Sequence, residues 1–259
     1  MPAISVGVQL SSFGLPFKQA IQVASGLGAD SIEIDARSDL RPTELTATAL
    51  RQIRKLLNDL NLRVVAVRFQ TSRGYDCAED LERRVSATKA AMKMASELGA
   101  NAVVNQIGII PESLEDSAHQ MLRDVLSDLG RHGQHVGAFL ACETGSEPLA
   151  NIAGLIESLP EGSLAVTLNP GNLIVNGFDL TGLRKIAPHV LLVHAKDAVP
   201  DRARGRGTEV ELGRGLVEFP ELMATLEEQH FRGSYVVQRD SKGNVREETA
   251  LAIQFLKNI

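Results

Sequence analysis

The feature that most constrains the fold is an alternation of eight short apolar, β-rich runs with segments of helical periodicity. The runs cover residues 4–10, 31–34, 62–69, 101–106, 137–143, 164–169, 190–195 and 234–239. Strands that alternate with helices form parallel sheets joined by right-handed crossovers. Eight such units close most economically into a (β/α)8 barrel, and a doubly wound open sheet is the alternative. The first run leads into "QLSSFG", which lacks the GxGxxG pattern of the open dinucleotide-binding sheet.

The segments between the runs carry the marks of amphipathic helices. In residues 42–61, an apolar stripe recurs at helical spacing; it consists of Leu50, Ile53, Leu57 and Leu60. In residues 76–99, Asp76 and Glu79 have the spacing of a capping box, and Gly99 is a typical C-terminal stop. We therefore expect the helix that follows the third run to begin near Asp76.

Length and composition predict one soluble domain over residues 1–259, without a linker or a second domain. The 259 residues include 44% hydrophobic side chains, which is enough for a full core. No window approaches the roughly 18 to 20 apolar residues of a membrane span, and the N-terminus lacks the features of an export signal. The only cysteines, Cys77 and Cys142, are too few for a disulfide framework, which favours a reducing, cytoplasmic compartment.

The net charge of −5 argues against a nucleic-acid partner. A local exception is "PDRARGRG", residues 200–207, where Arg202, Arg204 and Arg206 alternate with small residues. One interpretation is a solvated loop. The other is a cap that binds an anionic part of a ligand, because the loop follows the seventh run and barrels commonly bind phosphate with their last loops. Under that interpretation, Arg204 and Arg206 are candidate ligand-binding residues.

The carboxyl ends of barrel strands carry the functional residues of this fold. The expected ends are polar throughout: Gln9, Ser11, Ser12, Glu33, Asp35, Arg68, Gln70, Asn105, Gln106, Glu143, Asn169, Asn172, His194, Lys196, Asp197 and Gln238. This polarity favours a small-molecule site over a structural scaffold. Phe13, Asn105, Gln106 and Asn172 are the candidates for contacts to a ligand.

Two of these ends contain groups that are suited to chemistry. Glu143 closes an apolar run, where a carboxylate is costly unless it is paired or coordinated; otherwise it is the first polar residue of a loop. His194 and Lys196 are two residues apart and share one face of a strand, while Asp197 points away. His194 can also be read as a hydrogen-bonded core residue and Lys196 as a surface lysine. Two polar groups on one face of an apolar strand more often line a pocket.

Four strand-end motifs resemble, in order, the last four strands of the xylose isomerase-like sugar phosphate isomerase/epimerase family. The motifs are "ACETG", "TLNPGNLIVNG", "VHAKDA" with the later "ELGRGLVEFPELMATLEE", and "GSYVVQRD". The resemblance implies a (β/α)8 barrel that acts on a carbohydrate with one divalent cation, often Mn²⁺ or Mg²⁺. In that family, the cation is held by Glu, Asp, His and Glu after strands five to eight, and the two Glu residues also move a proton.

Carried over to this chain, the resemblance assigns Glu143 and His194 to the first Glu and the His of the metal set. Asn169 stands in place of the Asp and Gln238 in place of the second Glu. Hard dications prefer anionic oxygens, so two lost charges should cost roughly 10³-fold or more in metal affinity. An amide also cannot give or take a proton at neutral pH. The resemblance thus implies a degraded, weak metal site.

Three functions remain open. The first is an isomerase or epimerase, with Glu143 and His194 at the reacting centre and Lys196 polarising an oxygen. The second is a catalytically inactive barrel that binds a sugar-like ligand, in which Glu143 is expected to pair with Lys196. An endonuclease IV-like phosphodiesterase is a remote third. Its zinc cluster needs histidine and carboxylate ligands, whereas the third and fourth runs end in arginine and amides.

Overall fold

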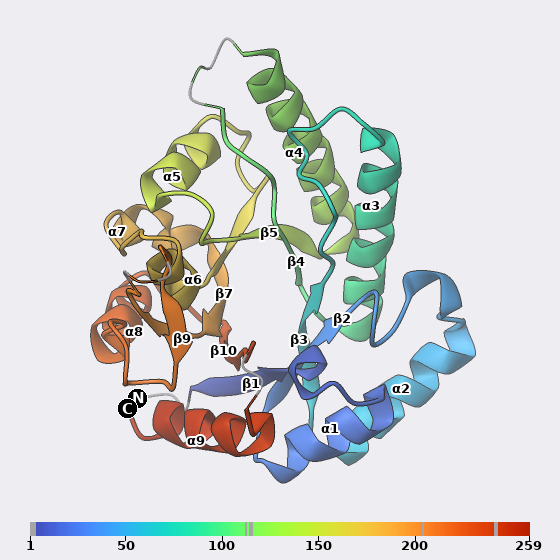
Figure 1. The fold of residues 1–259 in the computed structure, drawn as a ribbon. Coiled ribbons are helices and arrows are strands. Elements are labelled where there is room, and N and C mark those ends of the chain that lie inside the picture. Colours follow the sequence, from blue (N-terminus) through green and yellow to red (C-terminus); the bar gives the residue numbers. More distant parts are fainter. Residues whose placement is uncertain (1–3, 112, 114–115, 202, 204, 241–242) are drawn as a thin grey trace.

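The computed structural model describes residues 4–111, 113, 116–201, 203, 205–240 and 243–259. Eight parallel strands form a closed barrel in the order β1-β10-β7-β6-β5-β4-β3-β2 (Figure 1). The strands are β1 (Ser5–Gln9), β2 (Ser31–Asp35), β3 (Arg63–Arg68), β4 (Ala102–Asn105), β5 (Phe139–Glu143), β6 (Ala165–Leu168), β7 (Val190–Ala195) and β10 (Ser234–Val237). The predicted (β/α)8 barrel is confirmed, and the open-sheet alternative is excluded.

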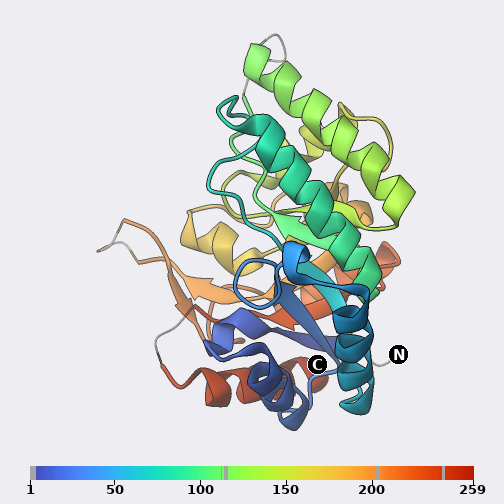
Figure 2. The ribbon, with the colours of Figure 1, turned by 90° about the vertical axis from the view of Figure 1, so that its right-hand side faces the viewer.

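Helices surround the barrel, and α3 and α4 lie side by side on one flank (Figures 1 and 2). The α-helices are α1 (Phe17–Gly26), α2 (Ala47–Asp59), α3 (Leu81–Leu98), α4 (Ser117–Val136), α5 (Leu149–Glu157), α6 (Pro170–Val175), α7 (Leu183–Ile186), α8 (Phe219–Glu228) and α9 (Val245–Lys257). Short 3-10 turns are η1 (Leu10–Phe13), η2 (Pro42–Glu44) and η3 (Ala187–His189). Within the described part of the chain, no helix combines the length and apolar character that a membrane crossing requires.

Successive side chains of a strand point to opposite sides of the sheet, and this alternation determines which of them enter the barrel. A small apolar cluster, separate from the larger core beneath the helices, consists of Ala66, Ala102, Val104, Ala141, Leu192 and Val236. Side chains two residues further along a strand point to the same side. Arg68, Glu143, His194 and Gln238 therefore follow this cluster toward the barrel mouth. On the other strands, Val8, Ile32 and Leu168 belong to the outer core. Their neighbours point inward: Gln9, Glu33 and Asn169.

The start of α3 differs from the capping-box prediction. The helix begins at Leu81, with Asp80 as its N-cap at a φ of 54°. Asp76 lies instead against Gly108, where an added Cβ would come 1.8 Å from the Asp76 Oδ1 atom. The loop after β3 therefore packs onto the loop after β4 through Asp76. The predicted stop is confirmed, because Gly99 ends the helix with a φ of 84°.

An antiparallel hairpin follows β7, where only a loop was expected. It consists of β8 (Asp197–Val199) and β9 (Thr208–Val210), and it extends from the barrel in Figure 2 (orange). Asp197 points away from the mouth, as predicted, and is fully buried. Its carboxylate accepts backbone N–H bonds at 2.8–3.0 Å; the donors are Ala198, Gly213, Gly215 and Val217. These bonds tie the segment after the hairpin to the end of β7.

Candidate functional site

A histidine held between two carboxylates occupies the centre of the barrel mouth. His194 Nε2 lies 2.8 Å from Glu33 Oε2, and His194 Nδ1 lies 2.9 Å from Glu143 Oε1. The side chains of Glu33 and His194 are fully buried, and that of Glu143 is 2% exposed. Each ring nitrogen thus faces a carboxylate oxygen, an arrangement in which both nitrogens donate when the ring is protonated.

Amide side chains complete the hydrogen bonding of both carboxylates. Gln9 Nε2 donates to Glu33 Oε1 at 2.6 Å, and Gln70 Nε2 donates to Glu143 Oε2 at 3.1 Å. Asn169 Nδ2 donates to Glu143 Oε1 at 2.8 Å and to Gln238 Oε1 at 3.0 Å. We call this set the mouth network; its members are Gln9, Glu33, Gln70, Glu143, Asn169, His194 and Gln238.

The local structure explains why residue 169 is an amide. Asn169 is the N-cap of α6, and its Oδ1 accepts the backbone N–H of Asn172 at 3.0 Å. Its Nδ2 is then free to donate to Glu143, a bond that an aspartate at this position would lack. A carboxylate here would also stand beside that of Glu143 without a proton between them. Asn169 thus caps α6 with its side-chain oxygen and donates to the mouth network with its side-chain nitrogen.

The charges of His194 and of its two partners, Glu33 and Glu143, stabilise one another. Burial alone would raise the pKa of Glu143, but the charge of His194 and hydrogen bonds from His194 and Asn169 lower it to about 2. Burial alone would lower the pKa of His194, but the charges of Glu33 and Glu143 and their hydrogen bonds raise it to about 10. At neutral pH, the mouth network therefore contains a positive ring between negative groups.

The mouth network does not fit a divalent cation. A cation needs an imidazole lone pair and carboxylate oxygens that converge on one point. Here Glu33 and Glu143 lie at opposite edges of the His194 ring, and both ring nitrogens are used as donors. Among the described residues, no three His, Cys, Asp or Glu side chains form a group that could hold a metal ion. The four positions of the implied metal set lie together, but they bind one another.

The expected pairing of Glu143 with Lys196 is wrong. Lys196 is buried and forms ion pairs with Asp240 and with Glu209, the latter at 3.6 Å. Glu209 belongs to the unpredicted β9, and it also pairs with Arg239 at 2.8 Å. Asp240, after β10, and Glu209 of the hairpin therefore neutralise Lys196, while His194 and the amides already bind both oxygens of Glu143.

The other candidate ligand contacts lie around the mouth network. Asn105 points outward, where its Oδ1 accepts the N–H of Thr71 at 3.1 Å and its Nδ2 donates to Tyr75 Oη at 2.8 Å. Its amide therefore holds the loop after β3 instead of facing a ligand. Gln106 is exposed, whereas Phe13, which packs against the core, and Asn172 are half-buried.

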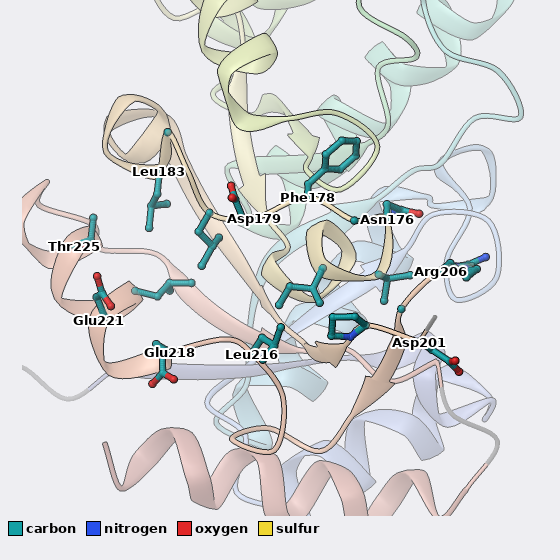
Figure 3. Close-up of a pocket in the computed structure, with 18 of the residues that line it drawn as sticks. Asn176, Phe178, Asp179, Leu183, Asp201, Arg206, Leu216, Glu218, Glu221 and Thr225 are labelled. Carbon is teal, nitrogen blue, oxygen red and sulfur yellow. The ribbon is translucent and has the colours of Figure 1, made fainter. Parts of the chain in front are cut away.

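The arginine-containing segment of residues 200–207 is only partly described, because Arg202 and Arg204 lie outside the described residues. Arg206 is exposed and lines a cavity of about 1010 Å³ between α6, α7, the hairpin and α8 (Figure 3). The described lining of this cavity includes no residue of the mouth network. Arg206 thus faces a separate cavity, and the capping role of Arg204 stays a prediction.

The sequence assigns no specific role to three members of the mouth network: Gln9, Glu33 and Gln70. Each stood among the polar strand ends, yet nothing local marked it as more than a boundary residue. The available signal lay in "SIEID", where Glu33 interrupts a strand whose five residues are all buried. A buried carboxylate at an inward position requires a charged or hydrogen-bonding partner.

Comparison with known proteins places these features in a family context. The model of the family described as xylose isomerase-like TIM barrel matches residues 21–259. A xylose isomerase domain protein from Planctomyces limnophilus is 24% identical, with a TM-score of 0.85 over 99% of this chain and 97% of that one. No curated protein matches the chain.

Two further solved structures share the fold at lower identity. A xylose isomerase-like TIM barrel protein from Mycobacterium smegmatis, in complex with magnesium, is 15% identical (TM-score 0.77; 99% and 95% of the two chains). The 3-keto-D-glucoside 4-epimerase from E. coli is also 15% identical (TM-score 0.75; 99% and 100%). At this identity, the likeness concerns the fold alone.

Proposed function

The chain belongs to the xylose isomerase-like TIM barrel family, and from this premise we propose that its barrel mouth binds a small carbohydrate or related polyol without a divalent cation. The observation that carries the proposal is the position of His194 between Glu33 and Glu143. An imidazolium stands among the carboxylates where a metal-dependent relative would have its cation. The positive charge that organises the mouth therefore comes from the chain itself.

The chemistry of the mouth network suits a ligand that is rich in hydroxyl groups. Hydroxyls both donate and accept, and the network combines carboxylate acceptors with amide donors in one small area. Six of its seven members are buried, and Gln70 is half-buried, so Gln70 is the member nearest to solvent. A polyol that displaces the bond from Gln70 to Glu143 gains a charged acceptor, and such bonds are stronger than neutral ones.

The same arrangement favours binding over turnover. Proton transfer at neutral pH needs a group that can hold and release a proton near that pH. Gln238 cannot do so, and the oxygens of Glu143 are already bonded to His194, Asn169 and Gln70. Isomerase or epimerase activity is the second candidate. It is favoured by the two carboxylates of the mouth, because such a reaction moves a proton between neighbouring carbons.

Calorimetric titration with D-fructose, D-tagatose and myo-inositol tests the proposal. We expect saturable binding of at least one polyol that is the same with EDTA and with Mn²⁺, and no conversion of the bound sugar. The substitution Gln70→Ala removes the donor that competes with the polyol for Glu143 Oε2, so binding should strengthen about tenfold, since a hydrogen bond to a charged group is worth about 1.5–3 kcal/mol. The matched control Gln120→Ala, on the exposed face of α4, should change nothing. Binding that requires Mn²⁺, or turnover of the ketose, would contradict the proposal.

A further inference from the structure

We propose that a cleft on the flank of the barrel, between the segments that follow β2 and β3 and the first turns of α3, binds a phosphate-bearing small molecule. The cleft has a volume of about 680 Å³. Its charged lining residues are Arg37, Arg41, Arg73, Arg83, Arg84 and Asp80. We call it the arginine cleft. This inference does not depend on polyol binding at the mouth network.

The balance of charge in the arginine cleft is opposite to that of the whole chain. The chain has a net charge of −5, whereas the cleft contains five arginines and one aspartate. Acids from outside the lining pair with two of the arginines: Arg41 with Glu44 at 3.4 Å, and Arg73 with Glu79 at 2.5 Å. Even with these acids counted, the positive charges exceed the negative ones by two. A bound dianion would neutralise this excess.

Two exposed arginines of the cleft form no ion pair with an acid. Arg37 and Arg83 take part in none of the ion pairs formed among the described residues. Both are exposed on the cleft side of their segments. Their charges are therefore available to a ligand without the loss of an existing salt bridge.

Two arginines are held in place before any ligand arrives. Arg84 is 8% exposed, and its terminal nitrogens donate to the backbone carbonyls of Glu79 and Cys77. Its Nε is buried and has no hydrogen-bond partner among the described residues. The guanidinium of Arg37 lies over the ring of Phe69, with its carbon 4.8 Å from the ring centroid. Groups that are fixed in advance lose less entropy when a ligand binds.

The guanidinium groups that line the cleft are suited to binding a phosphate group. A guanidinium presents a planar fork of donors that matches two oxygens of one phosphate. Thr43 and Ser72 also line the cleft, and their hydroxyl groups are neutral donors. A volume near 680 Å³ lies in the usual range for small-molecule pockets and leaves room for an organic part beside the phosphate.

The arginine cleft and the mouth network share one chain segment but use different side chains of it. Gln70 points into the mouth network, while Phe69, Thr71 and Arg73 line the cleft. The two sites therefore adjoin along the segment after β3. A variant of Arg37 or Arg83 leaves every hydrogen bond of the mouth network in place.

Titration calorimetry with inorganic phosphate, at an ionic strength kept constant with chloride, tests the proposal. We expect one saturable site in the unmodified protein. Arg37→Gln and Arg83→Gln should each weaken it about tenfold, which corresponds to about 1.4 kcal/mol per lost charged contact. Arg37→Lys should recover only part of the loss, because an ammonium keeps the charge without the fork.

The matched control is Arg232→Gln, which removes one exposed arginine beside the start of β10. It should leave phosphate binding unchanged, and urea unfolding of each variant verifies that the fold persists. The proposal is overturned if the unmodified protein shows no saturable phosphate binding. It is also overturned if Arg232→Gln weakens binding as much as the cleft variants do, because the effect would then come from total charge.

Discussion

Replacing His194 with glutamine is expected to lower the free energy of unfolding by roughly 3–5 kcal/mol, the usual cost of breaking a buried ion pair. The change leaves the carboxylates of Glu33 and Glu143 buried without the cation between them. Urea unfolding at pH 6 measures the loss. His189→Gln is the control, because His189 is exposed in η3 and its replacement should have little effect. Equal small losses in both variants would show that His194 is not charged.

The difference in unfolding free energy between the unmodified protein and His194→Gln should also depend on pH, which gives a second measurement on this variant. The pKa of His194 is raised from 6.5 to about 10, so its stabilisation is complete below pH 6.5 and is lost as the pH rises through 10. The pKa of Glu143 is lowered from 4.5 to about 2, so its contribution is present above pH 4.5 and is lost as the pH falls through 2. The gap between the unmodified protein and His194→Gln should therefore be widest near pH 5–6 and close toward pH 10.

The double substitution Asn169→Asp with Gln238→Glu is expected to raise Mn²⁺ affinity by roughly 10³-fold. Asn169 Nδ2 lies 2.8 Å from Glu143 Oε1 and 3.0 Å from Gln238 Oε1, so the new carboxylates would stand against an existing one. Such a cluster is costly when empty and attracts a hard dication. Each single substitution should recover only part of the gain, because ligands of one ion act together.

Calorimetric Mn²⁺ titration of the four proteins measures this gain. The control pair Asn176→Asp with Gln229→Glu adds the same two charges at exposed positions and should add no affinity. Tight Mn²⁺ binding by the unmodified protein would show that amide oxygens suffice. An unchanged affinity in the double variant would show that positions 169 and 238 do not surround an ion.

The barrel could be predicted from the sequence because the residue patterns that produce its strands and helices are local and repeat along the chain. Each apolar run marks a strand buried on both faces, and each helical segment has its own period. The strand ends then place Glu143, Asn169, His194 and Gln238 together, since parallel strands deliver their carboxyl ends to one mouth. Closure of the barrel follows from the number of units rather than from any single motif.

The partners within the mouth could not be predicted from the sequence, because they depend on distant pairs. His194 binds Glu33, which is 161 positions away in the chain, and only the closed barrel brings them together. The sequence predicts that Lys196 pairs with Glu143, because a lysine would neutralise a carboxylate that is costly to bury. The prediction is wrong because Asp240, after β10, and Glu209, of the β8–β9 hairpin, pair with Lys196, and hairpin register is not visible in "RGTEVEL".

The state of the His194 ring in the folded protein tests the account most directly. We would record the ¹⁵N spectrum of the histidine rings at pH 8, with and without Mn²⁺, and identify His194 by the signals missing from His194→Gln. The account predicts that both ring nitrogens of His194 carry protons at pH 8 and that Mn²⁺ leaves their signals sharp. A neutral ring, or His194 signals that vanish when Mn²⁺ is added, would contradict it.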